Sequence, residues 1–216
     1  MSTGVRWLVL LAAFLVGCGG DDKPAPTNSS GPRLQGAPLA ITNACAKAAT
    51  PSALPVLCPT RWPSPRGRGA PKARLFGEVS DVYLINVENG FSRRGGHIFH
   101  VMVGGQAQPF GRWPAGVEPD LRVTTRKVTI PQQGGGRFVQ KLPARRIATA
   151  RVHGAGAVVL QEPPYPAGGI HGGHVVVLWN EAGHGYLVSV HGERLSRHKV
   201  VSIALAMARS MRRSRT

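Results

Sequence analysis

The sequence has no long apolar run, few acidic residues and few aromatic ones. No stretch of 18 or more apolar residues occurs among its 216 residues, which excludes a polytopic membrane protein. Charged residues are only 17% of the chain, beside 28 glycines and 18 prolines, so a coiled coil and a mostly helical bundle are also excluded. The hydrophobic fraction of 42% still suffices for the core of one domain of ordinary size.

Motifs that would identify an enzyme are missing as well. The glycine-rich segments 134–136 and 168–173 match neither a P-loop nor a dinucleotide fingerprint, so they are more simply explained by turns. Ser189 lacks the G-x-S-x-G elbow of hydrolases, and the ten acidic residues are too scattered for the carboxylate pair of a glycosidase. We therefore predict no catalytic residue and no cofactor, and the sequence favours a protein that is not an enzyme.

The first 18 residues have the organisation of a secretory signal. Arg6 provides a short positive region, and residues 7–16 are apolar. A helix of that length covers roughly 15 Å, about half of the hydrocarbon core of a bilayer, so it is too short for a permanent span. A signal peptide cut elsewhere and a short anchor are the alternatives, but no A-x-A-like site lies just downstream.

The end of this segment, Leu15-Val16-Gly17-Cys18, resembles the lipobox of bacterial lipoprotein precursors. The resemblance implies cleavage after Gly17 and attachment of diacylglycerol to the sulfur of Cys18, which becomes the N-terminus of the mature chain. Two or three acyl chains hold a protein far more firmly than one. We therefore expect residues 1–17 to be a signal peptide and the mature protein to be exported and lipid-anchored at the extracytoplasmic face of a bacterial membrane.

Export also bears on the segment that follows and on the other cysteines. Residues 18–36 are rich in Pro, Gly and Ser without a hydrophobic period, which predicts a disordered tether. Disulfides persist outside the cytosol, and Cys45 and Cys58 remain as a pair once Cys18 carries lipid. We expect a disulfide between them, with two buried free thiols as the alternative. No CxxC-type spacing indicates a metal site.

Positive charge is in large excess, with 27 Lys+Arg against 10 Asp+Glu and a formal net charge of +17. Basic patches favour polyanions, which for a cell-envelope protein are phospholipid head groups and anionic wall polymers. No nucleic-acid-binding motif accompanies the charge, so nucleic acid is not expected. A solvated basic surface without a partner is the alternative. The clusters are Arg66 with Arg68, Lys72 and Arg74; Arg145 with Arg146; and Arg209, Arg212, Arg213 and Arg215.

The rest of the chain divides into two parts. Residues 37–73 predict a short helix over 37–47, capped at Thr42 or Asn43, and then a Pro/Arg-rich surface loop. Residues 74–216 predict the globular domain. Runs of β-branched and aromatic residues bounded by turn formers indicate its strands. The predicted strands cover residues 81–88, 97–103, 123–130, 146–153, 157–161, 174–179 and 186–190.

A helix over residues 197–213 closes the chain. Val200, Ile203 and Met207 recur at the helical period, and Ser196 is its expected N-cap. The apolar stripe predicts a helix that covers the sheet; a membrane-lying helix is the alternative, disfavoured because the stripe lacks Trp and Phe. The expected fold class is α+β, a mainly antiparallel sheet covered by a C-terminal amphipathic helix. The final strand–turn–strand–helix also looks like the carboxyl end of uncharacterised secreted proteins from high-GC bacteria, a likeness that implies no activity.

Histidines are the candidates for metal ligands. His97 and His100 lie three apart on a predicted strand, so their side chains are expected on opposite faces. His171 and His174 flank two glycines in a loop that enters a strand, and they could converge on one ion. A site would still need a third ligand, and acidic residues are scarce here.

Three functional hypotheses follow from these patterns. The favoured one is a membrane-anchored envelope lipoprotein that acts as a non-enzymatic binding or structural module through its basic surface. The second is an envelope metal-dependent enzyme that uses His171, His174 and a further histidine. The third is an extracytoplasmic subunit or partner of a membrane complex, which docks through the basic C-terminal end.

Overall fold

The computed structural model describes residues 33–50, 52, 54–64, 70–79, 82–89, 96–110, 144–164 and 171–214. Several predicted features lie outside the described residues. These are the signal peptide with Cys18, the tether up to residue 32, the strand over 123–130, the glycines 134–136 and 168–170, and Arg66, Arg68 and Arg215.

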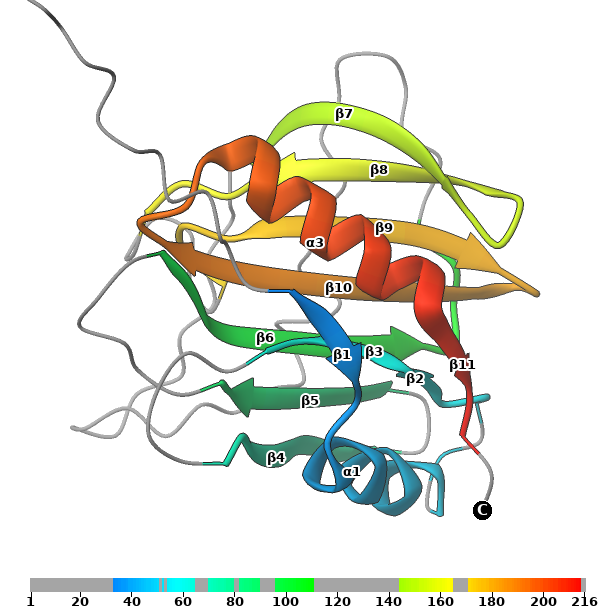
Figure 1. Ribbon diagram of the computed structural model, residues 1–216. Coiled ribbons are helices and arrows are strands. Elements are labelled where there is room, and N and C mark those ends of the chain that lie inside the picture. Colours follow the sequence, from blue (N-terminus) through cyan, green and yellow to red (C-terminus); the bar gives the residue numbers. More distant parts are fainter. Residues whose placement is uncertain are drawn as a thin grey trace, which may run out of the picture.

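Seven strands form one antiparallel sheet in the order β4-β5-β6-β10-β9-β8-β7 (Figure 1). Hairpins β7–β8 and β9–β10 close through the pairs His153–Gly154 and Ala182–Gly183, whose positive φ angles suit two-residue hairpin turns. The paired runs of Val, Leu and Ile pack well on a pleated surface. The strands are β4 (Lys72–Val79), β5 (Val82–Glu88), β6 (His97–Gln106), β7 (Arg145–Val152), β8 (Ala155–Gln161), β9 (Val175–Glu181) and β10 (His184–Glu193).

Two helices and four short strands lie on one face of this sheet (Figure 1). Strand β1 pairs with β3, and β11 pairs with β2. The covering elements are α1 (Leu39–Ala49), α3 (Arg197–Ser210), β1 (Leu34–Gly36), β2 (Leu57–Pro59), β3 (Arg61–Pro63) and β11 (Met211–Arg213).

Helix α3 packs its apolar stripe against the sheet. Val200, Ile203 and Met207 are buried in the core cluster beneath it, so the membrane-lying alternative for this stripe is wrong. Ser196 caps the helix as predicted, accepting a hydrogen bond from the backbone N–H of Lys199. Among the described residues, neither helix has the length and apolar character needed to cross a bilayer.

The predicted fold class, α+β, is wrong. The described residues form eleven strands and only two helices, so the fold is mostly β. A single helix laid on a sheet is not a helical layer, and short strands form much of the remaining cover. The predicted surface loop contains β2 and β3, with the Trp62 side chain fully buried. Helix α1 begins after Pro38 and is not capped by Thr42 or Asn43.

Cys45 of α1 and Cys58 of β2 form the predicted disulfide. Both residues are buried in the core cluster between α1 and the sheet, so the bond holds the N-terminal helix to the short strands. The alternative of two free thiols is thereby excluded.

Loss of this disulfide should lower the free energy of unfolding by about 3 kcal/mol, because a closed loop of this size restricts the unfolded chain. The measurement is urea denaturation of the full chain with and without reductant. A Cys45→Ala, Cys58→Ala double variant is the matched control, since reductant should leave its transition unchanged. Equal midpoints for the oxidised and reduced wild-type protein would contradict the prediction.

Candidate metal centre

Three histidines stand side by side on the face of the sheet opposite α3. His191 of β10 lies directly across from His100 of β6. In the β9–β10 register Val190 faces Val175, so one step further His191 faces His174, just ahead of β9. Along β10, Val190 belongs to the cluster beneath α3 and Leu187 to the cluster on the other face. Side chains alternate along a strand, so His191 lies on that second face, together with His100 and His174 that pair with it.

The three rings are in contact. Their centroids are 4.4 Å apart for His100 and His174, 5.0 Å for His174 and His191, and 5.3 Å for His100 and His191. One ring nitrogen from each lies within 4.8 Å of the others. Zinc binds histidine nitrogen at about 2.0–2.1 Å, which places tetrahedral ligands roughly 3.3 Å apart. Small side-chain rotations would bring the three nitrogens to that separation.

A β-bulge brings further polar groups to this end of the sheet. His191 pairs with His100 but Gly192 pairs with Ile98, so Phe99 is an extra residue in β6. The bulge places Ile98 in the cluster beneath α3 and therefore turns His97 to the same face as His100. The prediction of opposite faces for these two histidines is wrong because it assumed an unbroken two-residue period.

Ser189 lies on the buried side of the group, where its hydroxyl contacts two histidines. Its Oγ lies 2.7 Å from Nδ1 of His174 and 2.8 Å from Nδ1 of His171, and all three residues are buried. The hydroxyl has one proton, so it can donate to one ring and accept from the N–H of the other. The Nε2 atoms of both histidines have no hydrogen-bond partner among the described residues. When His174 donates its Nδ1–H to Ser189, its Nε2 lone pair is left as a ligand.

Burial keeps these imidazoles neutral. Burial, with a further contribution from His191, lowers the pKa of His100 from 6.5 to about 4. Burial and then His100 lower the pKa of His171 to about 4. The pKa of His174 is lowered well below 6.5, by burial and then by His100, His171 and His191. The pKa of His191 is lowered by burial and by His97, although Glu193 opposes the shift. Neutral imidazole is the form that binds a metal ion.

The lowered pKa values predict acid sensitivity of the metal-free protein. Unfolded histidine binds a proton near pH 6.5, whereas folded His171 does so near pH 4. The unfolded state therefore takes up more protons in this window, and the free energy of unfolding should fall as the pH drops from 6.5 to 4. The fully buried His171 alone would contribute about 3 kcal/mol.

Urea denaturation at successive pH values, with a chelator present, measures this effect. A His171→Asn variant, which keeps a polar atom near Ser189, should show a shallower pH dependence. A wild-type stability that stays level between pH 6.5 and pH 4 would contradict the buried neutral state.

Of the two predicted ligands, only His174 belongs to the three-histidine group. His171 lies behind it and contacts the group through Ser189. The third ligand was left open as a further histidine; His100 was considered only as a partner of His97, and His191 was not singled out. His191 could have been found, because counting back from a turn at Ala182–Gly183 sets it opposite His174.

Comparison of the chain with protein-family models, curated proteins and solved structures finds no match. The candidate centre therefore rests on the arrangement of this chain's own residues.

Proposed function

We propose that this protein is an exported, lipid-anchored protein that binds a first-row transition-metal ion through His100, His174 and His191. The supporting observation is the buried Nε2 of His174, which has no partner among the described residues and belongs to a ring packed against two other imidazoles. A buried polar atom without a partner costs about 1–3 kcal/mol, which a bound ion would offset.

The donor set indicates the class of metal. Three imidazole nitrogens without a carboxylate or thiolate in the group suit Zn²⁺ or Cu²⁺ rather than Mg²⁺ or Ca²⁺. Three protein ligands leave a fourth coordination position for water or another small ligand. His100 and His191 are partly exposed, so this position lies toward the accessible side of the group rather than toward Ser189.

Titration of the untagged, metal-stripped full chain with Co²⁺ and then Zn²⁺ tests the metal site. We expect one ion per chain, visible absorption bands of four-coordinate Co²⁺, and displacement of Co²⁺ by Zn²⁺. The expected Kd for Zn²⁺ is about 2 nM to 3 μM, because structural zinc sites bind with about 10–16 kcal/mol for four ligands and this group supplies three. Absence of saturable binding by either ion would overturn the proposal.

The lipid anchor is supported by the lipobox-like segment that ends at Cys18. Its test is the intact mass of the protein purified from membranes of a bacterial host. The expected mass is that of a chain beginning at Cys18 with a diacylglycerol on its sulfur. A mass that includes the leader, or an unmodified Cys18, would remove the anchor from the proposal and leave the metal site to be judged by its own titration.

Ser189 should position His174 for metal binding. Its replacement by alanine removes the hydroxyl that lies 2.7 Å from His174 Nδ1, and loss of such outer contacts typically lowers metal affinity 10–100-fold. The measurement is the Zn²⁺ affinity of Ser189→Ala beside that of Ser202→Ala, an exposed serine of α3 whose loss should have no effect. In the metal-free protein, nitrogen NMR shifts should also show a changed tautomer balance of His174 in Ser189→Ala and none in Ser202→Ala.

A further inference from the structure

A band of exposed arginines runs along one edge of the fold. The edge strand β7 contributes Arg145 and Arg151, helix α3 contributes Arg197 and Arg209, and β11 contributes Arg212. We propose that this basic edge is a docking surface for an anionic phospholipid bilayer.

The basic edge has arginines of β7 and α3 together at each end of the helix. At the start of the helix, Arg145 and Arg197 line the same hollow of about 460 Å³, where Glu162 is buried. At its end, the Arg209 Nε donates to the backbone carbonyl of Arg151 at 3.1 Å. A helix of 14 residues is about 21 Å long, so the two ends can meet several lipid head groups at once.

Two arginines of β7 face uncharged residues across the β7–β8 ladder, although the buried Glu162 lies in the hollow that Arg145 and Arg197 line. Across the β7–β8 ladder, Arg145 faces Gln161 and Arg151 faces Gly156. At the opposite edge of the sheet, by contrast, Lys72 of β4 faces Glu88. Arg145 and Arg151 therefore face no carboxylate across their ladder, whereas Lys72 does.

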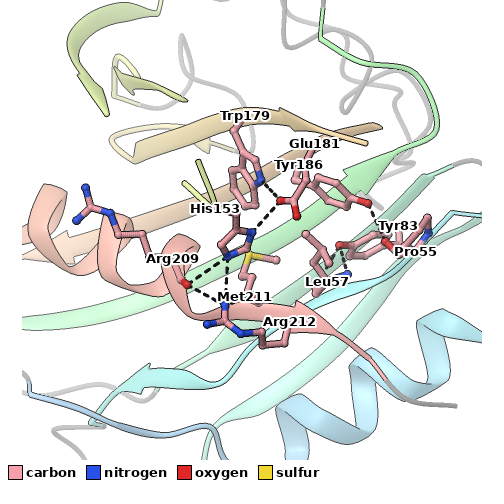
Figure 2. Close-up of polar contacts among 10 residues, drawn as sticks. All are labelled: Pro55, Leu57, Tyr83, His153, Trp179, Glu181, Tyr186, Arg209, Met211 and Arg212. Carbon is pink, nitrogen blue, oxygen red and sulfur yellow. Dashed lines mark hydrogen bonds and ion pairs between the residues drawn. The ribbon is translucent and has the colours of Figure 1, made fainter. Parts of the chain in front are cut away.

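The nearest carboxylate at the end of α3 is engaged elsewhere (Figure 2). Glu181 Oε2 contacts His153 Nδ1 at 2.8 Å and accepts a hydrogen bond from Trp179 Nε1 at 3.0 Å. The Arg212 guanidinium donates to the backbone carbonyls of Arg209 and Met211 and lies 3.3 Å from Nε2 of the same His153. Its guanidinium is thus fixed in place by neutral groups and keeps its charge.

The chemistry of the surface favours a bilayer over nucleic acid. Proteins that bind single strands stack bases on exposed aromatic rings. Among the described residues, the one large hydrophobic side chain that is exposed is Leu39, so no aromatic platform accompanies the arginines. If Cys18 carries lipid, a short segment separates the bilayer from Arg33, the first described residue, which raises the effective concentration of head groups.

Vesicle co-sedimentation tests the docking surface. The full chain with Cys18→Ser, which removes any acyl anchor, is mixed with phosphatidylcholine vesicles with or without phosphatidylglycerol. We expect binding to the anionic vesicles only, weakening as salt is raised. One arginine near such a surface raises the vesicle affinity about fivefold. The double variant Arg145→Gln, Arg197→Gln should therefore bind about 30-fold more weakly.

The matched control is Lys72→Gln with Arg74→Gln, which removes the same charge from two exposed residues of the opposite edge. Its binding should change less than about threefold. Equal losses in the two variants, binding to neutral vesicles, or tighter binding to a soluble polyanion than to vesicles would each overturn the proposal. The assay is run on metal-stripped protein, so failure of the metal site leaves its result unaffected.

Discussion

Replacement of His174 by alanine should weaken Zn²⁺ binding about 100- to 1000-fold. Structural zinc sites bind with about 10–16 kcal/mol over four ligands, so one ligand contributes roughly 2.5–4 kcal/mol. His174 supplies the most buried donor of the group, and its Nε2 has no other partner among the described residues. Competition titration against a chelator of known affinity measures the loss.

Two further variants keep this prediction independent of folding. His174 is buried, so its loss also disturbs the packing, whereas His100 and His191 are partly exposed. His100→Ala and His191→Ala should each cause a comparable loss of Zn²⁺ affinity with a smaller effect on stability. His198→Ala, an exposed position on α3, should bind as the wild type does. Wild-type affinity in all three variants of the group would place the metal elsewhere.

The largest effect on stability is expected for Trp62→Ala, a loss of about 3–5 kcal/mol in the free energy of unfolding. The Trp62 side chain is fully buried, and its Nε1 donates to Asn89 Oδ1 at 2.7 Å. Alanine would leave a cavity under the short strands and an acceptor without its donor on the buried Asn89. Urea denaturation followed by circular dichroism gives the change.

Trp62→Phe separates the two contributions. Phenylalanine restores most of the volume but not the hydrogen bond to Asn89, so its loss of stability should be clearly smaller than that of alanine. Leu39→Ala, at an exposed position of α1, should stay within about 0.5 kcal/mol of the wild type. A Trp62→Ala protein as stable as Leu39→Ala would mean that β3 does not pack on the sheet as described.

Local patterns predicted the C-terminal part of the fold well. The β9–β10 hairpin was predicted because two β-branched runs flank a cluster of turn formers. Helix α3 and its Ser196 cap followed from a stripe at helical period after a capping residue.

The parts that depend on distant pairing were not predicted. Strands β2 and β3 have three residues each, too few to show a period, and Trp62 is buried by partners far along the chain. The fold class was misjudged for the same reason, because these short strands take the place of a second helical element.

The candidate site shows the same division. The hairpin turn alone sets His174 against His191, so that pair could be derived from local sequence. His100 joins them through the β6–β10 ladder, which pairs remote segments, and through a bulge that changes which face each residue occupies. No local pattern specifies either feature.

The row of histidines runs from β6 to the β9–β10 hairpin and so joins two segments that are remote in the sequence. An ion held there would cross-link the centre of the sheet, and at about 1000 times its Kd it would add roughly 4 kcal/mol to the folded state. The metal-free protein would unfold more often and be degraded sooner. The amount of this protein in the cell would then depend on the supply of the ion, because the rate of its degradation would rise when the ion is scarce.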